Sequence, residues 1–409
     1  MKKFVILSFS VAGMGGGQMY QYNKAAYMKK KGYEVYIVYA IPGEIVIEDI
    51  KVVSHIICVE EINISPLVLT EKQIESVLTC ICSFIGVMNN DCIIESCNKV
   101  TSLWGELLAS RTGAVNHPFI IDEKIGSLDQ ASCQFFAYKR NNSELRGIKK
   151  ETYEMLFGRK PEEDSYEYCL PIPGNNVVAD IESPLINSIG GNYKRKICSI
   201  GRLDKAYVDT LAQELHIYAS NHSSESICIT FIGDDKDKKH IDKIRNSFLD
   251  LSNVTLFMLG SVYPIPEKLL YKFDLFISSA GSARVSGDRA IPTITIDARD
   301  FQSIGVYQYE TGNTVFRDNE AAIPISEKME YVFEHYDEIK SALHKTPQVN
   351  FDEVFDKHLN YYLNHVHTGK YYDVMSMKLD KKKKVEKIIY QCLGKKMYDK
   401  IRTFVFSKM

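Results

Sequence analysis

Two cations that follow a short apolar segment have the types and the spacing to bind an anion. Residues 196–205 read KICSIGRLDK, so Arg202 and Lys205 come directly after an expected strand that turns at Gly201. In an open α/β sheet, ligands bind at the carboxyl ends of the strands. An arginine and a lysine at that place suit a diphosphate. The alternative is a surface turn with two solvated charges, and this segment alone does not decide between the two.

A second turn with anion-binding character lies about eighty positions further along. An expected strand at 274–278 runs into Ser279, Gly281 and Ser282, which open a short helix. Backbone N–H groups at such a turn attract phosphate. Because parallel strands bring their carboxyl ends together at one edge, this turn is expected beside the two cations.

The first expected strand, residues 4–8, leads into a third candidate loop. The loop contains Gly13, Gly15, Gly16 and Gly17 and precedes a helix at 18–31 and a strand at 34–40. That second strand ends without an acidic residue, which argues against a nicotinamide cofactor. No Gly-Lys-Ser/Thr follows, which argues against a nucleoside triphosphate loop. The pattern favours a loop that offers backbone N–H groups to a substrate over a tight turn without a ligand.

Two carboxylates follow a buried strand expected at 118–121. Asp122 and Glu123 would then lie at the carboxyl end of that strand, where a carboxylate can act as general base. A solvated acidic loop is an equally good interpretation. His117 is the other candidate base, but its place at the start of the strand predicts the opposite edge of the sheet.

The elements that must position these residues form two βα series. The first includes a strand expected at 52–59 and a helix expected at 104–111, which Gly113 closes. The second includes a strand expected at 227–232, which runs into Gly233. The fold class predicted is α/β, with two facing Rossmann-like domains, a cleft between them and a C-terminal helix that crosses back. The predicted division has a first Rossmann-like domain at residues 1–175, a linker at 176–195, a second Rossmann-like domain at 196–345, crossing-back helices at 346–377 and a basic amphipathic tail at 378–409.

Composition narrows the function classes. The formal net charge of −2 gives no general field that would attract nucleic acid, and hydrophobic residues make up 45% of the chain, which is typical of a soluble globular protein. The ten cysteines contain no Cys-x-x-Cys pair, and several lie in apolar strands, as expected of reduced thiols in the cytosol. No structural metal is expected, because zinc spacing is missing. The N-terminal apolar stretch is too short for a signal peptide and continues as a strand–loop–helix unit.

The ordered set of short motifs resembles the glycogen-synthase-like glycosyltransferases of the GT-B fold (glycosyltransferase group 1, family 4-like) of bacterial polysaccharide synthesis. The resemblance covers most of residues 1 to 320. The matching segments are Gly15–Gln18, Gly32–Val35, Gly201–Leu203 with Lys205, Phe231 with Gly233 and Asp234, Leu259 with Gly260, Asp274–Ser278, Pro292 with Asp297, and Thr311–Asn313.

The resemblance implies transfer of a sugar from a UDP- or GDP-linked donor, with no cofactor and no metal. Arg202 and Lys205 would neutralise the leaving diphosphate. Gly281 and Ser282 would hold phosphate, Gly260 would line the base pocket, and the Gly15–Gly17 loop would face the reacting sugar. The first domain would hold the acceptor, and the second domain would bind the nucleotide sugar. The residues expected at the donor are Gly15, Gly16, Gly17, Gly201, Gly233, Gly260, Ser279, Gly281, Ser282 and Asp288.

One departure from the family pattern leaves the stereochemistry open. The family carries two glutamates, E-x7-E, but here the segment reads SSAGSARVSGDRAIP, with Val285 at the ribose-binding position and only Asp288 nearby. The Ala-Gly-Ser turn is similar instead to inverting lipid-linked peptidoglycan transferases. If the reaction inverts, Asp122 or Glu123 is the expected base; if it retains, the donor phosphate can take that role.

The C-terminal tail, residues 378–409, contains eleven Lys/Arg and three acids, a local charge of 11 − 3 = +8, with apolar residues at helical spacing. The pattern favours contact with an anionic membrane surface, and the alternative is a solvated helix that packs on the domain.

The function predicted is transfer of a sugar to a lipid-linked saccharide acceptor in capsule, lipopolysaccharide or exopolysaccharide synthesis. The protein is expected to be cytoplasmic and peripheral at the inner face of the membrane, without a nucleic-acid partner. The alternative is a degenerate GT-B subunit that binds a partner transferase or a nucleotide. A UDP-sugar epimerase is less favoured, because no cluster of acids and histidines is visible in the sequence.

Overall fold

The structure is a computed structural model. It describes residues 2–120, 129–148, 153, 156–157, 170–174, 178–235, 238–347 and 349–406. Asp122 and Glu123 lie outside the described residues. The chain divides into two compact units: unit 1 comprises residues 1–12, 20–173 and 350–409, and unit 2 comprises residues 13–19 and 174–349. The two units are described separately below.

Unit 1 is built on a six-stranded sheet in the order β3-β2-β1-β4-β5-β6, with all pairs parallel. The strands are β1 (Lys3–Ser8), β2 (Glu34–Tyr39), β3 (His55–Cys58), β4 (Ile93–Ser96), β5 (Val115–Ile120) and β6 (Gly147–Ile148). The helices are α1 (Gly16–Lys30), α2 (Ile50–Val53), α3 (Glu71–Ile85), α4 (Lys99–Thr112) and α5 (Gln130–Asn141), with short 3-10 turns η1 (Glu60–Asn63) and η2 (Pro66–Val68).

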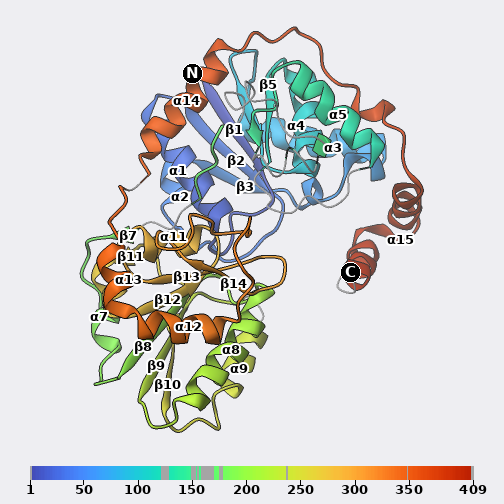
Figure 1. The fold of residues 1–409 in the computed structure, drawn as a ribbon. Helices are drawn as coiled ribbons and strands as arrows, with labels where there is room; N and C mark the ends of the chain where they lie inside the picture. The colour runs from blue at the N-terminus through green and yellow to red at the C-terminus, as the bar shows by residue number, and fades with distance from the viewer. Residues whose placement is uncertain are drawn as a thin grey trace. The chain divides into compact units, whose positions relative to one another are not determined.

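Both faces of the central strand β1 are buried, as expected of a parallel sheet covered on both sides. Val5 and Leu7 belong to the core formed with α3 and α4. Phe4 and Ile6 belong to the core formed with α1 and α14 (Phe351–Asn364). Figure 1 shows these helices on the two faces of the blue-to-cyan sheet.

Local signals explain where the helices of unit 1 begin and end. Thr70 caps α3 in a reciprocal capping box with Gln73, and Asn98 accepts hydrogen bonds from two backbone N–H groups at the start of α4. Gly32 follows α1 at φ +86° and Gly113 follows α4 at φ +79°, a region that glycine adopts without a steric penalty.

Two expectations for unit 1 were wrong in detail. Residues 52–53, expected at the start of a strand, close the short helix α2, and the strand begins only at His55. The strand expected at 118–121 begins at Val115, so His117 lies in its middle, opposite Glu95, rather than at an edge. The residue types at 52–53 and at Pro118 do not mark the start of a strand, so these two boundaries could not be predicted from the sequence.

Unit 2 is built on a second six-stranded sheet in the order β10-β9-β8-β12-β13-β14, parallel except for the β13–β14 pair. Its strands are β8 (Arg195–Ile200), β9 (Ile227–Ile232), β10 (Val254–Met258), β12 (Leu275–Ser278), β13 (Thr293–Ile296) and β14 (Ser303–Val306). Its helices are α7 (Leu185–Ser188), α8 (Tyr207–Asn221), α9 (Lys239–Asn246), α10 (Glu267–Leu270), α11 (Gly281–Gly287), α12 (Ile325–Glu334) and α13 (Tyr336–Ala342).

The segment expected as a linker carries two elements of unit 2. Strand β7 (Val178–Ala179) pairs with β11 (Ile265–Pro266), and Ile186 of α7 is buried in the core beneath β8 and β12. On the other face of the same sheet, α8, α9 and α12 cover Ile197, Ile229 and Ile277.

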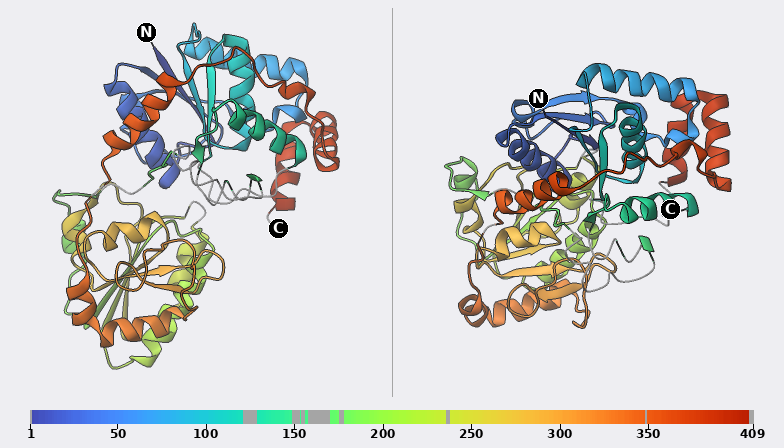
Figure 2. Two further views of the ribbon diagram at one scale, coloured as in Figure 1. Left: turned by 45° about the horizontal axis from the view of Figure 1, so that its top comes forward. Right: turned by 90° about the horizontal axis from the view of Figure 1, so that it is seen from above.

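After unit 2 the chain returns to unit 1 through α14, as the predicted fold class requires. Phe355, Tyr361 and Tyr362 of this helix are buried against the sheet of unit 1. The last helix, α15 (Lys381–Phe406), is broken at Gly394, where φ is +73°, and Figure 2 draws its two segments at an angle to each other. Tyr390 and Tyr398, one on each segment, enter the core of unit 1. Among the described residues, no helix combines the length and the apolar character needed to cross a membrane.

Candidate functional site

The strand order of unit 2 predicts where a ligand would bind, at the carboxyl end of β8. Strand β8 is bonded on one side to β9 and on the other to β12, so the chain changes direction across the sheet at this strand. Ligands in open α/β sheets bind at such a switch point, outside the carboxyl ends of the strands. The turn after β8 begins with Gly201, and the turn after β12 contains Gly281. The two predicted anion-binding turns therefore end neighbouring strands.

Three predicted glycines meet at this edge, where the backbones of their turns touch. The Gly233 N–H donates to the Gly260 carbonyl at 2.8 Å, and the Gly201 N–H donates to the Ile232 carbonyl at 3.0 Å. A Cβ atom on Gly233 would lie only 1.8 Å from the Gly201 carbonyl oxygen. Gly233 is therefore required by a close backbone approach at φ +154°.

The two turns also approach each other through Ser282. Its hydroxyl lies 3.9 Å from the position that a Cβ atom on Gly201 would occupy. The Ser278 hydroxyl accepts a hydrogen bond from the Ile200 N–H at 3.0 Å, which ties the ends of β8 and β12 together. Arg202 and the Gly281 turn consequently lie at one edge of one sheet.

Arg202 projects into solvent from this edge. Its side chain is 48% exposed and its Nε atom lies 3.3 Å from Asp204 Oδ1. An exposed pair of this kind is worth little, so the guanidinium can exchange Asp204 for a phosphate at small cost. Lys205 is three positions further, partly exposed, before the start of α8.

Helix α1 is shared between the units: residues 13–19, which include its first residues, belong to unit 2. A Cβ atom on Gly15 would lie 3.9 Å from Arg202 Cδ, and one on Gly16 would lie 3.2 Å from the Gly174 carbonyl oxygen. The helix begins at Gly16, two residues earlier than predicted, so Gly16 and Gly17 belong to its first turn. The glycine-rich loop and Arg202 therefore lie together.

The turn after β12 is held in a strained backbone conformation. Ala280 has φ +55° and ψ −135°, which an L-residue rarely adopts. Its N–H donates to the Thr314 carbonyl at 2.6 Å, and the Ser279 hydroxyl donates to the Ile296 carbonyl at 3.1 Å. Ser279 thus secures the turn, while the N–H groups of Gly281 and Ser282 occupy the first turn of α11, where no intrahelical acceptor exists.

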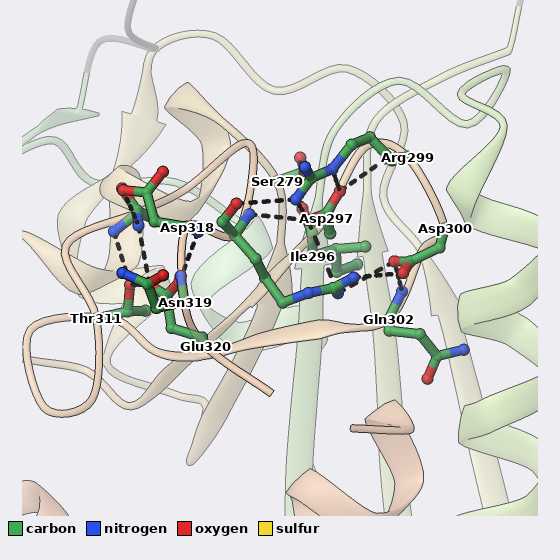
Figure 3. Close-up of polar contacts among 12 residues, drawn as sticks. Ser279, Ile296, Asp297, Arg299, Asp300, Gln302, Thr311, Asp318, Asn319 and Glu320 are labelled. Atoms are coloured by element: carbon green, nitrogen blue, oxygen red, sulfur yellow. Dashed lines mark hydrogen bonds and ion pairs between the residues drawn. The ribbon is translucent and has the colours of Figure 1, made fainter. Parts of the chain in front are cut away.

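A buried carboxylate, Asp297, directly follows Ile296, whose carbonyl accepts the hydrogen bond from Ser279. Asp297 follows β13, is completely buried, and accepts hydrogen bonds from the Arg299 side chain at 2.6 and 2.9 Å and from the Arg317 N–H at 2.8 Å. Burial alone would raise the pKa of Asp297, but these hydrogen bonds hold it well below its usual range. Arg317 also pairs with Asp300, and Figure 3 shows the network beside Ser279.

A second acid organises the loop that carries Thr314. Glu320 accepts hydrogen bonds from the Thr311 hydroxyl, from the Asn313 amide at 2.9 Å and from the Asp318 N–H at 2.7 Å (Figure 3). These donors lower the pKa of Glu320 to about 2. The loop is therefore fixed by an ionised carboxylate. This role of Glu320 was not predicted, because only the Thr-Gly-Asn turn is recognisable in the sequence.

Asp288, the acid expected near the donor ribose, already has two partners. It lies 3.3 Å from the Arg284 Nε atom and accepts a hydrogen bond from the Tyr307 hydroxyl at 3.1 Å. It follows the last turn of α11, whereas the Gly281 turn precedes the first. Val285, at the position of the family glutamate, is buried in the core.

In unit 1, the structure removes His117 from the candidate bases. The side chain is buried, and its Nδ1 atom lies 2.9 Å from the Tyr361 hydroxyl. Burial and the neighbouring His365 lower the pKa of His117 well below its usual range. Asp122 and Glu123 cannot be placed beside it, since they lie outside the described residues.

Comparisons with known proteins agree with this architecture. No model of a known protein family and no curated protein sequence matches the chain. Solved structures do match. HepE of Anabaena, crystallised with UDP and glucose, is 12% identical, with a TM-score of 0.59 over 88% of this chain and 99% of HepE. A glycosyltransferase of Rickettsia africae is 14% identical, with a TM-score of 0.59 over 96% of this chain and 99% of its own.

The chain has the GT-B fold. The fold does not fix the activity, because it also occurs in a candidate UDP-N-acetylglucosamine 2-epimerase of Listeria monocytogenes. That protein is 10% identical, with a TM-score of 0.51 over 90% of this chain and 98% of its own. The assignment of an activity therefore depends on the residues at the carboxyl edge of the unit 2 sheet.

Proposed function

We propose that this GT-B protein is a glycosyltransferase that moves a sugar from a UDP- or GDP-linked donor to a lipid-linked saccharide in capsule, lipopolysaccharide or exopolysaccharide synthesis. The observation that carries the proposal is the meeting of the Arg202 turn, the Gly281 turn and the Gly15 loop at one edge of unit 2. Arg202 supplies the charge that offsets a leaving diphosphate, and Gly281 and Ser282 supply N–H donors. The UDP bound to HepE supports a uridine nucleotide.

The donor site is tested by ligand-induced stabilisation of the full chain. A nucleotide sugar at about 100 times its dissociation constant adds about 2.7 kcal/mol to the free energy of unfolding. We expect one of the UDP- and GDP-sugars to raise the melting temperature, and Arg202→Ala to abolish the rise. Arg245→Ala is the matched control, because Arg245 is an exposed arginine that pairs with Asp242 on α9. A full rise in the Arg202 variant would exclude the diphosphate assignment.

The group that we propose as general base depends on whether the sugar is transferred with inversion or with retention of configuration. If the sugar is transferred with inversion, Asp122 or Glu123 accepts the proton of the acceptor hydroxyl. If it is transferred with retention, the donor phosphate accepts it, and Asp122→Asn and Glu123→Gln should each keep most of the wild-type rate. The anomeric configuration of the product, determined by NMR, together with these two rates, separates the alternatives.

We further propose that the protein works at the cytoplasmic face of the membrane, with residues 378–409 against an anionic leaflet. Support comes from apolar side chains of α15 that remain exposed although Tyr390 and Tyr398 are buried: Ile388 is 61% exposed and Leu393 is 53% exposed. They lie among the lysines of the tail, and this combination suits an interfacial helix.

The membrane contact is tested with point variants, because deleting the tail would remove two core tyrosines. Ile388→Gln combined with Leu393→Gln should reduce cosedimentation with phosphatidylglycerol vesicles while the fold persists. Val52→Gln is the control, since Val52 is 69% exposed on α2. If the double variant at 388 and 393 cosedimented with the vesicles as fully as the Val52→Gln control, this would count against a contact between the tail and the membrane.

One observation favours a second candidate, a degenerate GT-B subunit that binds a nucleotide or a partner transferase. No carboxylate occupies the Val285 position, and Asp288 is engaged with Arg284 and Tyr307. Such a subunit would show the thermal shift with a nucleotide sugar but no release of free nucleotide with any acceptor. Turnover that depends on Arg202 would exclude it.

A further inference from the structure

A cluster of side chains of types that bind metals lies in unit 1. Glu144 follows α5, while His365 and His367 follow α14, 221 or more positions later in the sequence. One ligand atom from each of the three residues lies within 4.8 Å of the other two. Glu144 Oε1 is 3.4 Å from His365 Nε2 and 2.8 Å from His367 Nδ1.

The separation of Glu144 Oε1 from His365 Nε2 is that of neighbouring ligands in a tetrahedral zinc site, and the separation from His367 Nδ1 is shorter by 3.4 − 2.8 = 0.6 Å. Zn–N and Zn–O bonds of 2.0–2.2 Å place neighbouring ligand atoms about 3.4 Å apart. His365 has extended backbone, with φ −76° and ψ 126°, and side chains two positions apart on an extended chain point to the same side. A His-x-His pair with a facing carboxylate is a ligand set that zinc uses with one solvent position open.

Two buried carboxylates, Glu106 and Glu144, contact the same lysine. Lys139 is buried between two carboxylates, 2.8 Å from Glu106 Oε2 and in contact with Glu144 Oε2. Two carboxylates therefore share one ammonium group, and Oε1 of Glu144 is directed to the two imidazoles.

The two histidine side chains keep some exposed surface, and one of their ring nitrogens lacks a hydrogen-bond partner among the described residues. The His367 Nε2 atom is buried without a hydrogen-bond partner among the described residues, and the side chains of His365 and His367 remain 6% and 12% exposed. The ring of His117 stands edge-on to that of His365, with the centroids 5.2 Å apart.

We propose that Glu144, His365 and His367 bind one divalent cation of the zinc class, through Glu144 Oε1, His365 Nε2 and His367 Nδ1. The cation fastens the segment after α14 to the end of α5, and so holds the returning chain on unit 1. No step of the proposed sugar transfer passes through it. The expectation that the chain holds no metal rested on cysteine spacing and on the transfer reaction, neither of which involves these residues.

The experiment is a Co2+ titration of the full-length protein after treatment with EDTA. Co2+ in a tetrahedral nitrogen and oxygen site absorbs visible light, and Zn2+ should displace it. We expect one equivalent per chain and a higher melting temperature with Zn2+. His367→Ala and His365→Ala should each weaken binding at least about tenfold, in line with ligand losses at zinc sites. His216→Ala is the control, because His216 lies 3.1 Å from Asp250 in a similar pair on unit 2.

Two results would overturn the proposal. One is the absence of a visible band at one equivalent of Co2+, which would leave an ion-pair cluster only. The other is an unchanged band in the His365→Asn, His367→Asn double variant, which would place the metal on thiols such as the exposed Cys80 and Cys392. Circular dichroism of the double variant in EDTA shows whether it folds. If it does not, His367→Gln, which keeps a polar side chain, repeats the titration.

Discussion

Replacing Gly233 by alanine should disturb the carboxyl edge of the unit 2 sheet more than the same change at Gly260. Both glycines have positive φ, +154° and +69°. They differ in their surroundings: a Cβ atom on Gly233 would lie 1.8 Å from the Gly201 carbonyl oxygen, whereas one on Gly260 would meet nothing within 4 Å. The pair therefore separates the cost of the backbone angle from the cost of the contact.

The magnitudes follow from this geometry. Real Cβ atoms stay at least 3.0 Å from other heavy atoms, so the Gly201 turn must move by at least 3.0 − 1.8 = 1.2 Å. Overpacking of this kind costs about 1–3 kcal/mol, and the positive φ costs an alanine about 1–2 kcal/mol. Gly233→Ala should thus lose about 2–5 kcal/mol, against about 1–2 kcal/mol for Gly260→Ala.

Hydrogen exchange measured by mass spectrometry provides the assay. Since about 1.4 kcal/mol corresponds to a factor of ten, peptides covering β8 and β9 should exchange about 30-fold faster or more in Gly233→Ala, and about 5- to 30-fold faster in Gly260→Ala. Peptides covering β1 and β4 in unit 1 serve as the internal reference. Equal acceleration in the two variants would show that the backbone contact between Gly233 and Gly201 does not exist.

Three further predictions concern charges and caps. Lys24→Met should cost about 3–5 kcal/mol, because it leaves the buried Glu95, 3.5 Å away, without its cation; the midpoint of urea unfolding followed by Trp104 fluorescence measures this, and adding Glu95→Gln should recover part of the loss. Asp297→Asn should cost about 1.5–3 kcal/mol at neutral pH. Because the folded-state pKa of Asp297 is depressed, its contribution is complete above the unfolded value near 3.9 and is lost as the pH falls below it. The unfolding midpoints of the variant and the wild type, followed by circular dichroism, should therefore converge on acidification, which the exposed Asp242→Asn would not show. Asn98→Ala should cost about 0.5–2 kcal/mol through the lost cap of α4, again read from Trp104 on that helix; a change below 0.3 kcal/mol would mean that the cap is unimportant.

The sequence predicted the elements best where a local signal marks their ends. Strand β9 was predicted with both its ends, 227 and 232, because the apolar run stops at Gly233. The helices that end at Gly32 and Gly113 were also found, since glycine there permits the left-handed turn. Boundaries without such a signal were less accurate, as the late start of β3 shows.

The candidate site was only partly predictable for a different reason. Gly201, Arg202 and Gly281 could be found because each lies in a short turn after a recognisable strand. The groups that fix these turns, such as Glu320 and the pair of Arg317 with Asp300, act through contacts between distant loops. The cluster of Glu144 with His365 was invisible because its members lie 221 positions apart. Local patterns carry no information about such contacts.

Proximity and chemistry at the unit 2 edge have separate origins. The Arg202 and Gly281 turns meet because β8 pairs with both β9 and β12, and a chain of that topology brings the two turns together whatever their side chains are. The likeness to other GT-B structures accounts for this proximity alone. A leucine at position 202 would leave the contact between Gly233 and Gly201 intact and remove only the guanidinium group, with its charge and its N–H donors. Variants at position 202 therefore test the chemistry of the site, and variants at Gly233 test its architecture. If a variant at position 202 loses nucleotide binding while the hydrogen-exchange rates of β8 and β9 stay unchanged, the loss comes from the missing guanidinium group.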